Sequence, residues 1–217
     1  MQSSDISRKE IYRYLGYRGI TPDAQIAAKV EECLEKLLSV SEPKCAVKRF
    51  PVSQPEAGVT MIGDLVVRSE GLARNLTGCK EAYLMAVTIG IGVDRLIARA
   101  NVTDVTAAAI YQAAGAACVE AWSDEVNARL LAEAREEGLF GRPRFSPGYG
   151  DFSLEHQRDF ARILEMSRIG ISLSDSLLMT PSKSVTAVIG LSETDHHCQV
   201  TGCDACDLGG DCAFRRE

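Results

Sequence analysis

The sequence predicts a mixed fold in which long helices pack with short strands. The chain has 217 residues, of which 46% are hydrophobic, so it can bury a sizeable core. Apolar residues recur at helical spacing from Ile26 to Leu38, and residues 104–136 form the longest helical stretch. An apolar run from Tyr83 to Ile89 that ends at a glycine is typical of a buried strand.

The N-terminal third contains helix signals followed by shorter segments. A first helix is expected from Arg8 to Leu15. In Thr21-Pro22-Asp23, a capping residue precedes a proline at the first helical position, which predicts that the second helix starts there. Residues 46–52 and 59–67 are expected to form short strands or turns, and residues 70–76 a short helix.

A glycine-containing turn is expected in the middle of the chain. The strand at Tyr83–Ile89 passes through Gly90 and Gly92 into a helix over residues 93–100. This segment begins like a dinucleotide-binding loop, but Arg95 stands where the third glycine belongs. We therefore expect a strand-to-helix turn and no nicotinamide cofactor.

The C-terminal half alternates between loops and regular elements. A loop is expected at residues 138–150, and Ser153 is expected to cap a helix that runs to Glu165. Residues 177–191 are expected to form two strands, broken at Thr180-Pro181-Ser182-Lys183.

Charge and composition exclude several classes of partner. The formal charge is −6 without clusters of Lys and Arg, so neither nucleic acid nor membrane is expected to bind. No apolar run is long enough to cross a bilayer, and the first residues lack the apolar centre of a signal peptide, so we expect a cytoplasmic protein. Thiols stay reduced in that compartment. Four scattered cysteines are expected to be buried as small hydrophobic residues: Cys33, Cys45, Cys79 and Cys118.

The segment Arg144-Phe145-Ser146-Pro147-Gly148-Tyr149-Gly150-Asp151 has the composition of a ligand-binding loop. Prolines 143 and 147 stiffen it, and Gly148 and Gly150 allow the backbone to approach a ligand closely. An arginine can hold a carboxylate through two parallel hydrogen bonds. The loop therefore suits a small zwitterion. The alternative is a surface turn with an incidental arginine.

This loop resembles the R-x-x-x-G-Y signature of one family, the S-adenosylmethionine-binding reactivation (activation) domain of cobalamin-dependent methionine synthase. The matching residues are Arg144, Pro147, Gly148 and Tyr149. A second segment, residues 176–185, resembles the family's Ser, Met-x-Pro and Ser-Val pattern at nearly the same separation. The resemblance spans roughly residues 113–191.

The resemblance implies an α+β fold with an antiparallel sheet flanked by long helices and the Arg144 loop at its open edge. Residues 1–192 would form this domain, and residues 193–217 a cysteine-rich metal-binding tail.

The resemblance also implies roles for individual residues. Arg144 would hold the carboxylate of S-adenosylmethionine, and Ser146, Pro147, Gly148 and Tyr149 would seat the cofactor. Glu120 is matched to an acidic residue that the family places near the ligand, with a solvated helix face as the alternative. An aspartate that the family contributes from its N-terminal part has no counterpart that can be aligned.

The implied chemistry is reductive methylation of cob(II)alamin, a methyltransferase reaction that supports methionine biosynthesis. No segment resembles the family's cobalamin-, homocysteine- or folate-binding modules. The expected partner is therefore a separate corrinoid-binding methyltransferase subunit that carries the cobalamin, with flavodoxin or ferredoxin as the electron donor.

The last residues depart from the family pattern. Cys198, Cys203, Cys206 and Cys212 have a spacing that predicts metal binding. An iron–sulfur cluster would suit the need for a low-potential electron, whereas zinc would have only a structural role in the tail. A disordered thiol-rich end is the third interpretation.

Two other functions remain open from the sequence. One is a different S-adenosylmethionine-dependent methyltransferase. The other is an electron-transfer or adaptor protein built on the cysteine cluster.

Overall fold

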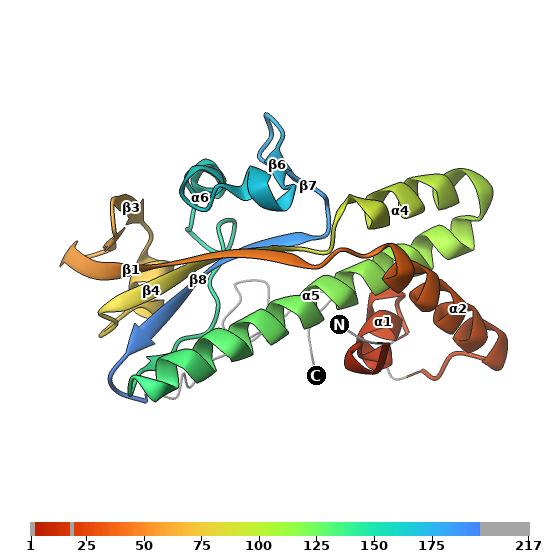
Figure 1. Ribbon diagram of the computed structural model, residues 1–217, viewed down its shortest axis with the longest axis horizontal. Helices are drawn as coiled ribbons and strands as arrows, with labels where there is room; N and C mark the ends of the chain where they lie inside the picture. Colours follow the sequence, from red (N-terminus) through yellow and green to blue (C-terminus); the bar gives the residue numbers. More distant parts are fainter. Residues whose placement is uncertain (1–2, 18–19, 196–217) are drawn as a thin grey trace.

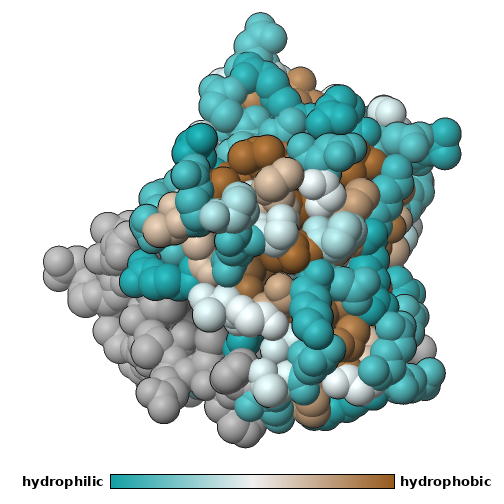
Figure 2. All heavy atoms as spheres, turned by 90° about the vertical axis from the view of Figure 1, so that its left-hand side faces the viewer, coloured by the Kyte–Doolittle hydropathy of each residue, from teal (hydrophilic) through white to brown (hydrophobic). Residues whose placement is uncertain are grey.

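Helices pack on both faces of a six-stranded antiparallel sheet in the computed structural model, which describes residues 3–17 and 20–195 (Figure 1). The strand order is β3-β2-β1-β4-β8-β5, and every pairing is antiparallel. The predicted α+β class, with an antiparallel sheet and long helices, is confirmed. At the end of the sheet where β3 lies, apolar side chains gather in the middle of the surface and hydrophilic ones border them (Figure 2).

The elements follow one another in this order: η1 (Ser3–Asp5), α1 (Arg8–Tyr14), α2 (Ala24–Val40), β1 (Lys44–Glu56), β2 (Val59–Ile62), β3 (Leu65–Arg68), α3 (Glu70–Asn75), β4 (Glu81–Thr88), α4 (Ile91–Thr103), α5 (Val105–Glu136), β5 (Phe140–Gly141), η2 (Leu154–His156), α6 (Gln157–Ile163), η3 (Met166–Ile169), β6 (Ser172–Leu173), β7 (Met179–Thr180) and β8 (Ser184–Ser192). β6 and β7 form a separate two-stranded sheet.

The central strand β4 is apolar from Ala82 to Val87 because both of its faces are covered. Tyr83, Met85 and Val87 belong to the core cluster that includes residues of α1, α2, α4 and α5. The alternate residues Leu84 and Ala86 belong to the cluster on the opposite face, which includes residues of α3, α6 and η3. Side chains alternate along a strand, so a strand buried on both faces reads as one unbroken apolar run.

Two elements near the N-terminus differ from the sequence-based prediction, and a third, residues 59–67, forms the short strands and turn that were expected. Helix α2 begins after Asp23 rather than Thr21, because the Asp23 carboxylate accepts the Ile26 amide at 2.8 Å and so caps the helix. Strand β1 is longer than expected, since it pairs first with β4 and then with β2. Residues 59–67 form a hairpin, in which Gly63, with φ +57°, lies in the turn between β2 and β3.

The predicted strand-to-helix turn is confirmed at Gly90 and Gly92. Gly90 adopts φ +88° at the start of α4, a backbone conformation that favours glycine. A side chain at Gly92 would collide with the carbonyl of Val40 in α2. These two glycines therefore let α4 turn sharply off β4 and pack against α2.

Two predicted elements in the C-terminal half end or begin elsewhere. Ser153 caps the short helix η2, and α6 ends at Ile163, short of the predicted Glu165, whose φ of +51° is not helical. The strand expected from Leu177 begins only at Met179, because Leu177 adopts φ +65° in the turn between β6 and β7.

Three of the four scattered cysteines are buried as predicted: Cys33, Cys79 and Cys118. Burial raises the pKa of Cys118 to about 12, so this thiol stays protonated at neutral pH. The prediction is wrong for Cys45, which is only partly buried and accepts a 3.5 Å contact from Arg129 Nη2. Within residues 3–17 and 20–195, no helix is both long and apolar enough to span a membrane.

Candidate ligand-binding site

The segment that leads into the predicted ligand loop lies at the edge of the main sheet, beside β8. Phe140 and Gly141 pair with Ser192 and Leu191. Further along, Phe145 and Val188 exchange two backbone hydrogen bonds of 2.9 and 2.8 Å. The loop is thus fixed to a buried strand on one side.

Consecutive side chains of this segment point to opposite faces of the sheet. Phe145 packs against the core cluster on the face of the sheet covered by α3 and α6, which we call the α3/α6-side core. Its ring is stacked 6.2 Å from that of Phe152. Arg144 contacts α5, on the other face. Extended backbone alternates its side chains, so burial of Phe145 on one face directs Arg144 to the other.

Arg144 is held by two carboxylates of α5 but retains unused donors. Its Nη2 donates to Glu120 Oε2 at 3.2 Å and to Asp124 Oδ1 at 2.8 Å. Its Nη1 is buried and has no hydrogen-bond partner in the described part of the chain. A guanidinium carries five N–H donors, and a buried donor that lacks an acceptor is costly. A ligand carboxylate could satisfy it.

Two carboxylates around one guanidinium leave an excess of negative charge. The side chains of Arg144, Glu120 and Asp124 are 21%, 35% and 66% exposed, so the cluster is partly open to solvent. A cationic group beside a bound carboxylate would find acidic partners there. The arrangement suits a zwitterion.

Residues 146–149 form a tight turn. The Ser146 carbonyl accepts the Tyr149 amide at 3.1 Å, Pro147 occupies the second position, and Gly148 has φ +94° at the third. These are the features of a type II turn, whose third position requires positive φ. Pro147 is buried, whereas Tyr149 is 61% exposed and packs its ring 6.4 Å from that of Phe145.

Asp151 ties the end of the loop to the start of α3. Its carboxylate accepts hydrogen bonds from the Ser69 hydroxyl at 2.5 Å and from the Glu70 and Gly71 amides at 2.6 and 3.1 Å. The Ser69 bond first, and then the two amides, hold the pKa of Asp151 below its ordinary value. The loop is therefore anchored at both ends.

The second motif segment has a structural role in the described residues. Met179 packs against the α3/α6-side core. The Ser184 hydroxyl donates to the Pro181 carbonyl at 2.7 Å, and Ser182 bonds Asp94 of α4 through its amide and its hydroxyl, each at 2.7 Å. The segment is thereby fixed between the sheet and α4.

The structure brings Arg144 and Glu120 together, as the sequence-based match required, and it adds Asp124. Sequence reasoning missed Asp124, although an acid four positions after Glu120 on a helix lies on the same face. Glu120 pairs with Arg144 rather than forming a purely solvated helix face. Its contact with a ligand stays a prediction.

The predicted metal ligands fall outside the described residues. Cys198, Cys203, Cys206 and Cys212 all lie in the segment after residue 195. Within residues 3–17 and 20–195, no group of three His, Cys, Asp or Glu side chains is arranged to hold a metal.

Comparison with known proteins identifies the fold. Thirteen chains of solved structures match this one. Among them is the crystal structure of the MetH reactivation domain bound to AdoHcy, with a TM-score of 0.68, 18% sequence identity, and coverage of 89% of this chain and 75% of that one. No family profile and no curated protein matches the sequence. The chain therefore has a methionine synthase reactivation-domain-like fold.

Proposed function

We propose that this protein binds S-adenosylmethionine and acts as a reactivation module for a cobalamin-dependent methionine synthase or a related corrinoid methyltransferase. One observation carries the proposal. The arginine of the signature-like loop projects from the sheet edge toward two acidic side chains, with a buried N–H group unpaired in the described residues. The structural neighbour with the same fold has AdoHcy bound.

The site offers a partner for each charged group of the cofactor. The carboxylate of S-adenosylmethionine would accept from Arg144 Nη1, while Glu120 and Asp124 would attract its ammonium and sulfonium groups. The type II turn at Pro147 and Gly148 would bring backbone against the ligand. Neutralisation by the acids offsets the cost of removing a cation from water.

The contribution of this chain to the reaction is positioning. A corrinoid held by the partner protein would supply the cobalt centre that is reduced by one electron and takes the sulfonium methyl group. Residues of this chain hold the methyl donor in place, which lowers the entropic part of the barrier. S-adenosylhomocysteine is the by-product.

Three further parts of the proposal concern the partner protein, the electron donor and the C-terminal cysteines of this chain. The corrinoid-binding methyltransferase subunit is a separate protein, and flavodoxin or ferredoxin supplies the electron. The cysteines at 198, 203, 206 and 212 hold an iron–sulfur cluster or zinc, in a tail that begins near residue 193.

The first prediction is that Arg144→Ala weakens S-adenosylmethionine binding by about 10- to 150-fold. This range corresponds to the ~1.5–3 kcal/mol of a hydrogen bond to a charged group. Isothermal titration calorimetry on the full chain measures it. Arg144→Lys should restore only part of the affinity, because an ammonium cannot reproduce the planar guanidinium.

A matched control is Arg158→Ala, which removes an exposed arginine of α6 that forms an ion pair with Glu155. It should bind like wild type. Equal affinity in wild type and Arg144→Ala would contradict the proposed site. Binding without corrinoid-dependent methyl transfer would instead favour a different S-adenosylmethionine-dependent methyltransferase.

A further inference from the structure

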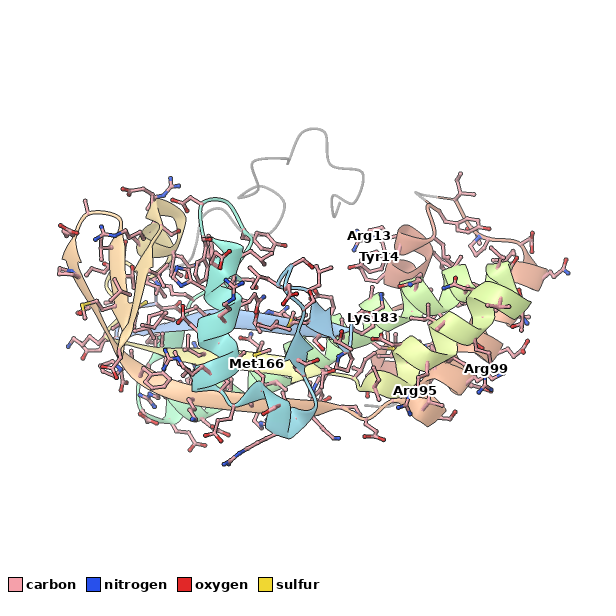
Figure 3. The ribbon with its side chains drawn as sticks, turned by 90° about the horizontal axis from the view of Figure 1, so that it is seen from above. Arg13, Tyr14, Arg95, Arg99, Met166 and Lys183 are labelled. Atoms are coloured by element: carbon pink, nitrogen blue, oxygen red, sulfur yellow. The ribbon has the colours of Figure 1, made fainter. Side chains whose placement is uncertain are left out.

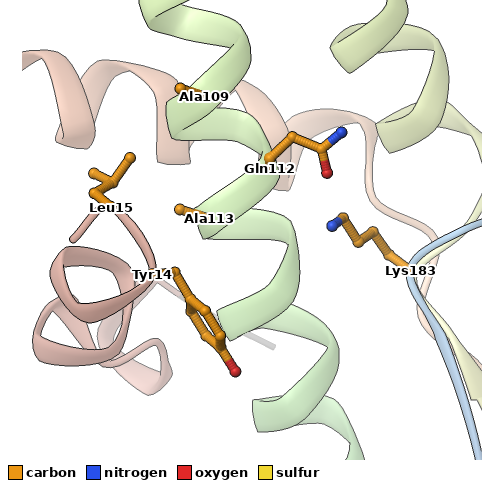
Figure 4. Close-up of a pocket in the computed structure, with 6 residues that line it drawn as sticks. All are labelled: Tyr14, Leu15, Ala109, Gln112, Ala113 and Lys183. Atoms are coloured by element: carbon orange, nitrogen blue, oxygen red, sulfur yellow. The ribbon is translucent and has the colours of Figure 1, made fainter. Parts of the chain in front are cut away.

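A pocket lies on the same side of α5 as Arg144 but nearer to α1. It has a volume of about 450 Å³ and is lined by Tyr14, Leu15, Ala109, Gln112, Ala113 and Lys183. Figure 4 shows α5 as its floor, with Tyr14 and Leu15 on one side and Gln112 and Lys183 on the other. The volume falls within the range of small-molecule sites, roughly 300–1,000 Å³.

The pocket is separate from the Arg144 cluster. Ala113 and Glu120 are about two helical turns apart along α5, or roughly 10 Å at 1.5 Å per residue. In the view from above, Lys183 lies close to Tyr14 at the α1 end of the molecule (Figure 3). The pocket and the Arg144 cluster therefore involve different turns of α5, so variants of each can be tested separately.

The backbone around Lys183 is fixed, so its side chain has a defined origin. The Lys183 carbonyl accepts the Ile89 amide at 3.2 Å. Both neighbours are bonded as well, Ser182 to Asp94 and Ser184 to Thr88 Oγ1. The lysine side chain thus projects from a rigid segment toward α5.

A glycine in the middle of α5 makes room for the lysine. A Cβ atom at Gly115 would lie 3.1 Å from Lys183 Cε and 3.3 Å from Cγ. Glycine in a helix interior is less favourable than alanine by about 1 kcal/mol. At this position the glycine leaves room for the lysine stem where it crosses the helix.

The partly buried Lys183 ammonium would be stabilised by an anion bound in the pocket. In the described part of the chain it makes no hydrogen bond or ion pair, and Asp94, the acid whose charge acts on it, is already bonded to Ser182. Burial lowers the pKa of Lys183, and Asp94 opposes this only in part. An anion in the pocket would relieve this cost. The side-chain amide of Gln112 adds a donor, and Leu15, Ala109 and Ala113 add apolar wall.

We propose that this pocket binds a small organic anion, with its carboxylate or phosphate group on Lys183 and its apolar part against Leu15 and the alanines of α5. The site is distinct from the methyl-donor site and does not depend on it. A cationic sulfonium would be repelled by Lys183, which separates the two ligand chemistries.

The test is a titration of the full chain with inorganic phosphate, butyl phosphate and butyrate, followed by NMR of the Gln112 side-chain amide. At least one organic anion should shift this signal. Lys183→Met keeps the length of the stem and should weaken binding at least tenfold. Lys36→Met, at an exposed lysine of α2, should have no effect. If Lys183→Met fails to fold, Gln112→Leu provides the second variant and should also weaken binding.

Three outcomes would overturn the proposal. The first is that none of the three anions perturbs Gln112. The second is equal anion affinity in wild type and Lys183→Met. The third is that Lys183→Met weakens S-adenosylmethionine binding as strongly as Arg144→Ala, which would place Lys183 in the methyl-donor site. Arg144→Ala should leave anion binding unchanged, so failure of one proposal is distinguishable from failure of the other.

Discussion

The turn at Gly148 depends on one backbone angle. A φ of +94° is accessible to glycine, whereas a β-branched residue adopts it only with strain. Space is not the constraint, since an added Cβ would meet only Leu154 Cδ1 at 3.4 Å. The Gly148 amide also donates to the Phe152 carbonyl at 2.7 Å, which closes the loop on itself.

We predict that Gly148→Val lowers S-adenosylmethionine affinity at least tenfold and leaves the core folded. The strain, of order 1–3 kcal/mol, is relieved by rearranging the loop, which moves Tyr149 and the backbone beside it. Calorimetry measures the affinity, and circular dichroism measures the thermal transition.

Gly138→Val is the matched control for this loop variant. Gly138 has φ +78° and no atom within 4 Å of an added Cβ, so it carries similar strain in a turn after α5. Its affinity for the ligand should be that of wild type. If Gly148→Val unfolds the domain, the glycine is structural and its functional role is lost.

At the residue scale, functional residues can be recognised from the sequence when their partners are close in the chain. Residues whose partners are brought near only by packing are missed. Arg144 and Gly148 stand out because prolines, glycines and an arginine occur in one short loop. Lys183 does not stand out, because its environment depends on Gly115, which is distant in the sequence but adjacent in the fold. Asp124 falls between these cases, since only its helical spacing from Glu120 marks it.

Helix α5 is the element that positions both proposed sites. Ala109, Ala113, Glu120 and Asp124 recur at spacings that place them on one face of this helix. Its N-terminal half is rich in alanine, which allows close approach of α1 and the Lys183 segment. The acidic residues begin where the helix passes the Arg144 loop.

We predict that the stabilising effect of Gly115→Ala depends on Lys183. In a Lys183→Ala background the new methyl group meets no lysine stem, so the variant should gain about 1 kcal/mol in the free energy of unfolding. In the presence of Lys183 the gain should be smaller, because the methyl group presses on the stem. Urea denaturation of the four proteins in this cycle measures the coupling. An equal gain in both backgrounds would show that the stem does not need the glycine.

At the element scale, long periodic helices and apolar runs were predictable, and short connections were not. The Asp104 cap of α5 and the strand β4 follow from local pattern. The hairpin of β2 and β3 and the short edge strand β5 depend on pairing with partners elsewhere in the sheet. Sequence periodicity cannot report such pairing.

For the whole molecule, the two core clusters determine what the domain needs in order to fold. One lies between the sheet and α1, α2, α4 and α5, and the other lies against α3, α6 and η3. Among residues 3–17 and 20–195, every member of the two clusters precedes position 192. The antiparallel sheet flanked by long helices was predicted from the family resemblance rather than from periodicity, and the strand order was not predicted at all, since antiparallel pairing over such distances leaves no local signal.

The last prediction follows from this division of the chain. A Cys203→Ser, Cys206→Ser double variant should lose its bound metal, measured by elemental analysis after anaerobic purification, but keep its main thermal transition, because the described residues already form two extensive core clusters and a domain of this size does not need a metal to fold. Cys45→Ser, at a partly buried cysteine of β1, is the control and should keep the metal. The absorption spectrum of the wild type distinguishes the metals, since sulfur-to-iron charge transfer gives visible bands and a zinc thiolate site is colourless.

If the centre carries electrons, the double variant should bind S-adenosylmethionine normally yet fail to remethylate cob(II)alamin with flavodoxin or ferredoxin as donor. Remethylation at the wild-type rate would mean that the metal centre has only a structural role. Loss of the whole thermal transition together with the metal would mean that the domain boundary near residue 192 is misplaced and that the cysteine segment supports the core.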